Sequence, residues 1–178
     1  MKFRDIQPFT RNPSYQVNVP LTHLQKTIDD FILNDGLNVS PDFQRHHVWD
    51  IGKREAFIEF ILRGGSSSKT LYFNHPGWRH SHVGEFVIVD GKQRLTSLLM
   101  FLNNEIRAFG TYYKDFEDRL DSLTNIIISI NDLQTQAEVL QWYLDINSSG
   151  VIHTKKEIQK VRNLLKDEKK KLKIQTRK

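Results

Sequence analysis

The segment from Glu85 to Leu102 constrains the fold more than any other part of the sequence. Glu85–Val89 is almost wholly apolar and rich in β-branched residues, which is typical of a buried strand. The leucines from Leu95 to Leu102 then recur at helical spacing, and only the short segment Asp90–Arg94 separates the two. A strand that turns directly into an amphipathic helix predicts a fold in which helices cover a sheet.

The rest of the chain contains further strands and helices in no regular order. Apolar runs predict strands over Tyr15–Pro20, Thr70–Phe73 and Ile126–Ile130, and apolar periodicity predicts helices over Leu21–Ile32, Lys53–Leu62 and Gln134–Ile146. In the second of these helices we expect Phe57, Phe60 and Ile61 to face the core. The mixture predicts an α+β (or α/β) domain, in which helices flank a mixed β-sheet.

Basic residues are concentrated at the C-terminal end. The chain has 26 Lys and Arg against 21 Asp and Glu, but residues 155–178 hold eleven of the former and three of the latter. The remainder is therefore slightly acidic. Thr154-Lys-Lys-Glu157 has the form of a capping box that opens a last helix. We expect residues 1–153 to form the folded domain and residues 154–178 to form a basic C-terminal helix and tail.

Two interpretations of this basic helix remain open. Lysines and arginines on a helix most often form a solvated face. They also suit contacts with DNA phosphates, which are sensitive to salt and carry no sequence information. The second interpretation gives these candidate DNA-binding residues: Lys155, Lys156, Lys160, Arg162, Lys166, Lys169 and Lys170.

The composition excludes several kinds of site and location. The chain has no cysteine, which excludes disulfides, thiolate zinc sites, a cysteine nucleophile and thiol redox chemistry. No apolar run approaches the roughly 20 residues that cross a bilayer, and the N-terminal segment contains no apolar signal core. We therefore expect a cytoplasmic protein without a membrane partner.

The Asp90–Arg94 turn is the strongest candidate site. The first amides of a helix have no acceptor within the helix, and the helix dipole adds positive potential there. Gly91 lets the backbone approach a phosphate closely, and Arg94 has the fork geometry that suits phosphate oxygens. Asp90 could hold a cation or a sugar hydroxyl, while Lys92 and Gln93 could add a charge and a hydrogen bond. The alternative is an ordinary turn with a surface arginine.

Two other features give weaker predictions. His75, His80 and His82 lie in one loop. Because the chain has no cysteine, a zinc site would need these histidines together with a carboxylate such as Glu85. The alternative, which is commoner, is that the loop histidines are solvated. Trp78 in the same loop could stack on a base. Asn147 is either a ligand-orienting residue or part of a helix C-cap with Gly150.

Three segments together resemble one protein family. Val89–Leu98, which reads VDGKQRLTSL, resembles the DGQQR signature of the N-terminal domain of GmrSD-type modification-dependent restriction proteins. Upstream, Pro41-Asp-Phe-Gln-Arg45 followed by Val48-Trp49 resembles that family's P-x-F-Q-R-x-x-V-W box. Downstream, Ile146-Asn-Ser-Ser-Gly150 resembles its I-N-x-x-G segment. The three boxes span nearly the whole chain.

The resemblance implies a ParB/sulfiredoxin-like fold whose pocket binds a nucleoside triphosphate with Mg²⁺. By position in the motifs, Asp90, Gln93 and Arg94 would be catalytic, and Asp90 would hold the metal. The nucleotide-binding residues would be Gln44, Arg45, Gly91, Lys92, Gln93, Arg94, Thr96 and Asn147. Lys92 stands where the family usually has a glutamine. A lysine there is compatible with anion binding, so the motif supports nucleotide binding more strongly than hydrolysis.

The biological setting that the resemblance implies is DNA restriction, phage defence or counter-defence. Restriction proteins of this family usually continue into a nuclease domain with an HNH-type metal site. Two expectations follow: the protein works alone, or its partner is a separately encoded nuclease or restriction component. Two alternatives stay open: a DNA- or partner-binding module without turnover, and a ParB-like DNA nuclease.

Overall fold

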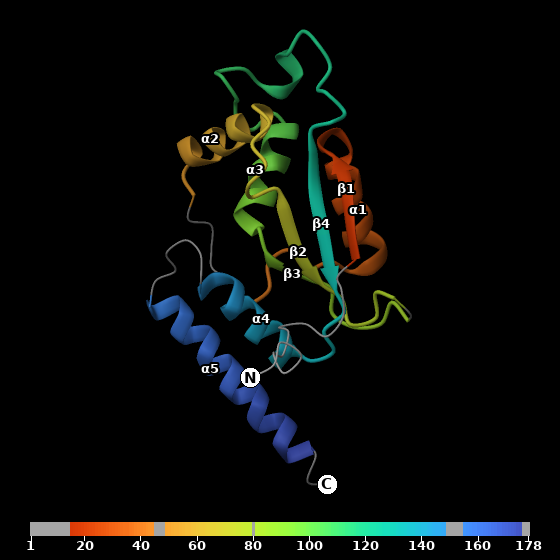
Figure 1. Ribbon diagram of the computed structural model, residues 1–178, viewed down its shortest axis with the longest axis vertical. Helices are drawn as coiled ribbons and strands as arrows, with labels where there is room; N and C mark the ends of the chain where they lie inside the picture. Colours follow the sequence, from red (N-terminus) through yellow and green to blue (C-terminus); the bar gives the residue numbers. More distant parts are fainter. Residues whose placement is uncertain (1–14, 45–48, 80, 149–154, 176–178) are drawn as a thin grey trace, which may run out of the picture.

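A mixed sheet of four strands lies at the centre of the molecule, in the order β1-β4-β2-β3 (Figure 1). β1 (Tyr15–Pro20) pairs antiparallel with β4 (Asn125–Asn131), and β4 pairs parallel with β2 (Thr70–Asn74). β3 (Val87–Asp90) completes the sheet by antiparallel pairing with β2. The strand that comes last in the sequence therefore separates the first two in space.

The computed structural model describes residues 15–44, 49–79, 81–148 and 155–175. A short 3-10 helix lies at Tyr113–Asp115, and the α-helices are α1 (Leu21–Asp35), α2 (Ile51–Leu62), α3 (Lys92–Leu102), α4 (Gln136–Ser148) and α5 (Lys155–Gln175). Within these ranges, no helix has the combination of length and apolar composition that a membrane crossing requires. The predicted α+β class with a mixed sheet is confirmed.

Alternate residues of the strands face two separate apolar clusters. Leu71 and Phe73 of β2, Ile88 of β3 and three isoleucines of β4 pack beneath α1, α2 and α3; these isoleucines are Ile126, Ile128 and Ile130. On the opposite face, Val87 and Val89 of β3 pack with α4 and α5. The two-residue period of a strand thus places helices on both sides of the sheet.

The predicted elements are found close to their expected positions, with one error in orientation. Phe60 of α2 is 41% exposed, although the sequence predicted it to face the core. The core-facing side of α2 is instead filled by Phe57, Ile58 and Ile61, which follow one another at helical spacing. Phe60 lies outside that stripe and is therefore left at the surface.

The C-terminal helix α5 is anchored to the body along its first half only. Val161 and Leu165 are buried in the same cluster as Val87 and Val89, and α5 runs alongside α4 there (Figure 1). Further along, Leu172 and Ile174 are exposed. The distal half of α5 projects away from the sheet (Figure 1).

Candidate functional site

The chain changes direction sharply between β3 and α3. Gly91 is the N-cap residue of α3 and has a φ of +104°, which residues other than glycine rarely adopt. A Cβ atom at this position would lie 2.7 Å from Cδ2 of Leu71, inside van der Waals contact. Gly91 has no side chain that could cap α3, and a phosphate is the kind of acceptor that the start of a helix favours.

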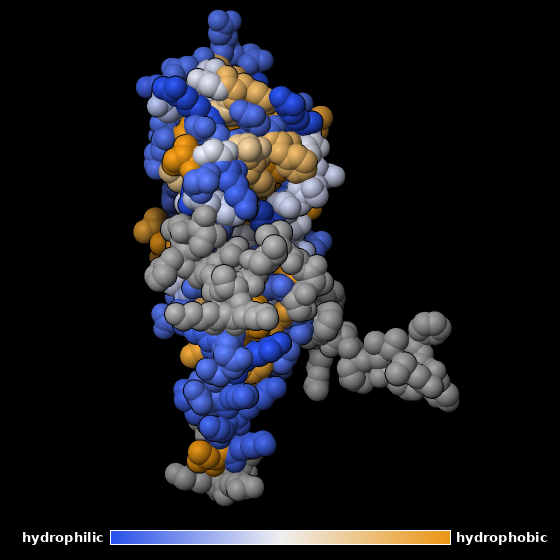
Figure 2. Space-filling view, turned by 90° about the vertical axis from the view of Figure 1, so that its left-hand side faces the viewer, coloured by the Kyte–Doolittle hydropathy of each residue, from blue (hydrophilic) through white to orange (hydrophobic). Residues whose placement is uncertain are grey.

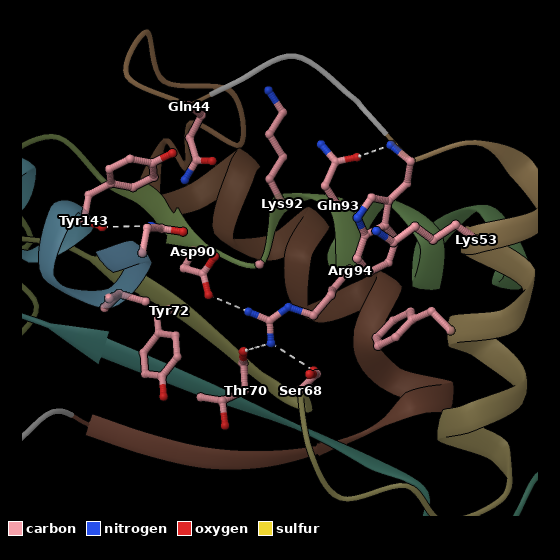
Figure 3. A pocket seen from close by; sticks show the side chains of 15 residues that line it. Gln44, Lys53, Ser68, Thr70, Tyr72, Asp90, Lys92, Gln93, Arg94 and Tyr143 are labelled. Atoms are coloured by element: carbon pink, nitrogen blue, oxygen red, sulfur yellow. Dashed lines mark hydrogen bonds and ion pairs between the residues drawn. The ribbon is translucent and has the colours of Figure 1, made fainter. Parts of the chain in front are cut away.

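Arg94 and Asp90 form an ion pair across this turn. Nη2 of Arg94 lies 2.6 Å from Oδ2 of Asp90, and Nη1 donates to the backbone oxygens of Ser68 and Thr70 at 2.9 and 2.7 Å. These contacts occupy three of the five N–H donors of the guanidinium. Arg94 therefore joins the first turn of α3 to the start of β2, and Figure 3 shows its fork directed at both partners.

Two glutamine side chains connect the segment around residue 44 to the same turn. Nε2 of Gln44 donates to the backbone oxygen of Val89 at 2.5 Å. Oε1 of Gln93 accepts from the backbone N–H of Trp49 at 3.3 Å. The first and second motif boxes are thus held together by side-chain amides, while Arg45 lies outside the described residues.

Lys92 is buried beneath the segment that leads to Gln44. Its side chain is directed away from Arg94 (Figure 3), and Nζ donates to Oγ of Ser40 at 2.7 Å. The residue is only 9% exposed, and this burial lowers the pKa of the Lys92 ammonium from its ordinary value. A buried ammonium with one hydroxyl acceptor is well placed to accept an anion as a further partner.

The three motif boxes meet around one cavity of about 450 Å³. Gln44 from the first box, Asp90–Arg94 from the second and Asn147 from the third all line it. Asn147 belongs to the last turn of α4, and its Nδ2 donates to the backbone oxygen of Tyr143 at 2.7 Å. Thr96, which sequence reasoning also assigned to the nucleotide, is not among the lining residues.

Trp49 and Ile146, from the first and third boxes, also line the cavity. Other lining residues were indicated by no motif: Lys53, Phe57, Ser68, Thr70, Tyr72 and Tyr143. The most important is Lys53, whose ammonium lies 5.1 Å from the centre of the Trp49 ring. With Lys53, the charged lining residues are three cations and Asp90, which leaves a net charge of +2. The cavity therefore combines positive charge, the amino end of a helix and aromatic side chains.

A comparison with protein families gives a direct match. The model for the GmrSD restriction endonuclease, N-terminal domain, matches residues 26–122, which is more than half of the chain and includes Gln44 and Asp90–Arg94. The chain belongs to the GmrSD N-terminal domain family. This confirms the resemblance recognised from the sequence and relates the chain to restriction proteins. Neither a curated protein nor a solved structure gave a match.

The histidine-containing loop of this GmrSD N-terminal domain lies outside the cavity, and its His75 and Trp78 pack into or against the core, whereas His82 is exposed. His75 is fully buried, and its Nδ1 accepts from the N–H of Gly77. Burial, with a smaller effect from the charge of His82, lowers the pKa of His75 from 6.5. Trp78 packs on Phe31 and Phe86. Among the described residues no group of three or more histidines and carboxylates is placed to hold a metal; His80 lies outside that part of the chain.

The basic residues of α5 have two different environments. Arg162, Lys166 and Lys169 are exposed, and so is Lys170, which lies 3.8 Å from Asp167. Lys160 is exposed as well, but its Nζ donates to the backbone oxygen of Asp42 at 2.7 Å. The side chains of Lys155 and Lys156 lie outside the described residues.

Proposed function

We propose that this GmrSD N-terminal domain binds a nucleoside triphosphate in the cavity and acts on or near DNA in restriction, phage defence or counter-defence. One observation carries the proposal. Three motif boxes that are far apart in the sequence supply Gln44, Asp90–Arg94 and Asn147 to a single positively charged cavity. The family match gives the biological setting.

The phosphate end of the ligand belongs at the amino end of α3. Backbone N–H groups at a helix start, together with the helix dipole, favour phosphate oxygens. Lys53 and Lys92 add two ammonium groups beside this turn, and Arg94 retains two N–H donors without a partner among the described residues. Phosphates placed there would neutralise the excess positive charge.

The nucleoside end belongs on the aromatic side of the cavity. Trp49 and Phe57 are in edge contact on one wall, with ring centroids 5.5 Å apart. Tyr72 and Tyr143 line it as well. A base stacked on such side chains gains roughly 1 to 3 kcal/mol whichever base it is, so these residues favour a nucleotide over inorganic phosphate.

Mg²⁺ accompanies the triphosphate in this proposal, with Asp90 as its protein ligand. Oδ2 of Asp90 belongs to the ion pair with Arg94, whereas Oδ1 has no hydrogen-bond partner among the described residues. One carboxylate oxygen suits Mg²⁺, which takes its remaining ligands from phosphates and water in such sites. When bound, the ion neutralises phosphate charge during transfer.

Hydrolysis is the second step of the proposal. Water would attack the phosphorus of the terminal phosphate, and the bond from that phosphorus to the bridging oxygen would break, which releases a nucleoside diphosphate and inorganic phosphate that takes up the proton of the water. The N–H groups of α3 and the two remaining donors of Arg94 would stabilise the charge on the phosphate oxygens. The Asp90–Arg94 ion pair favours a second candidate, a module that binds nucleotide without turnover, because three donors of Arg94 are already engaged. Phosphate release from each nucleotide separates these two candidates.

DNA binding is assigned to the exposed basic side of α5. Arg162, Lys166, Lys169 and Lys173 follow one another at intervals of four, three and four residues, which places them on one side of a helix. Figure 2 shows that the projecting lower part of the molecule has a mostly hydrophilic surface. Such a face supplies phosphate contacts that do not depend on base sequence.

Thermal unfolding with the four ribonucleoside triphosphates, with and without Mg²⁺, tests nucleotide binding. A true ligand at about 100 times its dissociation constant adds roughly 2.7 kcal/mol of stability. Tripolyphosphate and the matching nucleoside test the two ends of the cavity separately. If no nucleotide raises the unfolding temperature, the proposal is wrong.

Two lysine variants locate the ligand. Lys53→Ala removes a cation from the cavity and is expected to weaken triphosphate binding about fivefold, or ~1 kcal/mol. Lys26→Ala is the matched control, because Lys26 lies on α1 with Asp30 as its partner. Equal affinities for both variants would place the nucleotide elsewhere.

Nicking of plasmid DNA with Mg²⁺ or Mn²⁺ tests direct phosphodiester cleavage.

A further inference from the structure

We infer that Lys160 is a positioning residue of the nucleotide cavity and is not part of the DNA-binding face of α5. The inference rests on the proposed function, since it concerns how the cavity is held in shape. Nζ of Lys160 donates to the backbone oxygen of Asp42 at 2.7 Å, across 118 positions of sequence. Asp42 belongs to the turn that delivers Gln44 to the cavity.

The geometry of α5 separates Lys160 from the stripe formed by Arg162, Lys166, Lys169 and Lys173. Successive residues of a helix are rotated by about 100°, so Lys160 and Arg162 lie on nearly opposite sides. Val161 and Leu165, which are buried against α4, occupy the side between them. A DNA backbone that follows the stripe from Arg162 to Lys173 would therefore run on the side of α5 away from Lys160.

The turn that Lys160 contacts is fixed from several directions. The N–H of Gln44 donates to the backbone oxygen of Pro41 at 2.9 Å, which closes the turn. Ser40 accepts from Lys92, and the Phe43 ring packs on Tyr143 with centroids 5.4 Å apart. The contact from Lys160 adds the connection to α5.

Two residues that line the cavity depend on this turn. The side chain of Gln44 reaches Val89 at the end of β3, and Tyr143 is the residue against which Phe43 packs. Loss of the ammonium at position 160 would release one side of the turn and would shift Gln44 relative to α3. Among the described residues, Lys160 forms no hydrogen bond or ion pair with a residue that lines the cavity, so its effect on the ligand passes through the turn.

The test compares Lys160→Met with Lys166→Met, which removes an exposed lysine from the basic stripe. Lys160→Met is expected to weaken triphosphate binding roughly two- to tenfold, the range for one hydrogen bond, and to leave DNA affinity unchanged. Lys166→Met is expected to do the reverse. Lys160→Arg keeps an N–H donor and should restore nucleotide affinity, which a general loss of stability would not allow.

The Gln44 side-chain amide gives a readout that needs no nucleotide. In a ¹H–¹⁵N spectrum of the free protein, its resonances are expected to move in Lys160→Met and to stay in place in Lys166→Met. If the wild-type protein binds no nucleotide, the proposed function fails and this spectrum alone decides the role of Lys160. Unmoved resonances, or a loss of DNA affinity in Lys160→Met that equals the loss in Lys166→Met, would overturn the inference.

Discussion

Substitution of Gly91 by alanine tests the turn on which the candidate site depends. The change adds a single methyl group at a residue with a φ of +104°, and this methyl would lie 2.7 Å from Cδ2 of Leu71. Gly36, which ends α1, provides a matched control. It also has a positive φ, +67°, but no atom lies within 4 Å of the position that a Cβ would occupy.

The two substitutions share one cost and differ in a second. A left-handed conformation costs a residue with a Cβ about 1 to 2 kcal/mol, and this applies to both glycines. The overlap with Leu71 resembles an overpacked core, which costs a further ~1 to 3 kcal/mol. The gain from a less flexible unfolded chain is the same for both variants. Gly91→Ala should therefore lose about 1 to 3 kcal/mol more than Gly36→Ala.

Urea unfolding followed by tryptophan fluorescence measures this difference. With a slope of about 1 to 3 kcal/mol per molar urea, the unfolding midpoint of Gly91→Ala should lie clearly below that of Gly36→Ala. Equal midpoints would mean that Leu71 gives way without cost. The close approach of β2 to the start of α3 would then not be the reason for a glycine at position 91.

Three further predictions concern protonation, DNA and the ion pair. Burial lowers the pKa of His75 from 6.5, so the unfolded chain takes up a proton at a higher pH than the folded protein does. The free energy of unfolding should therefore fall as the pH drops below 6.5. His75→Phe should reduce this pH dependence, which urea titrations at pH 5 and 7.5 measure. A plot of log DNA affinity against log salt concentration has a negative slope, and Lys166→Ala should make that slope shallower by about 0.9. Fluorescence anisotropy measures the affinities, and an unchanged slope would mean that Lys166 does not contact DNA. Asp90→Asn should cost roughly 1 to 2 kcal/mol in the same unfolding assay, because Arg94 loses a charged acceptor that is partly exposed; no loss would mean that the ion pair does not form in solution.

Much of the fold could be predicted from the sequence because local patterns determine it. The predicted strand Glu85–Val89 overlaps three of the four residues of β3, Val87–Asp90, and the leucines after Arg94 mark α3. The orientation of Phe60 could not be predicted in the same way. Which side of α2 faces the core depends on where α3 lies, and three apolar residues already form a stripe without Phe60.

The start of α2 has a local sequence signal, an aspartate at the N-cap position. Asp50 is the N-cap of this helix, and its Oδ1 accepts from the N–H of Lys53 at 2.8 Å. Aspartate is among the preferred N-cap residues, so a helix from Ile51 was predictable from the sequence. With that start, Trp49 and Lys53 become neighbours at the mouth of the cavity.

The motif boxes indicated most of the cavity residues but not their contacts. Asp90 and Arg94 are four positions apart, a spacing that brings side chains together where a helix begins, so their ion pair was foreseeable. The bonds from Arg94 to the backbone of Ser68 and Thr70 were not, because they depend on the pairing of β2 with β3.

The position of β4 has a consequence for how the chain folds during synthesis. Among the described strands, β1 pairs with β4 alone, more than a hundred residues later, and β2 is joined to β1 through that same strand. Until residues 125–131 emerge from the ribosome, β1 has no strand partner and β2 can pair with β3 alone. Contacts at such long separations slow folding and leave apolar surface exposed meanwhile. A nascent chain of which fewer than about 130 residues have emerged should therefore be cut readily by proteases. Protection should appear abruptly once β4 pairs between β1 and β2.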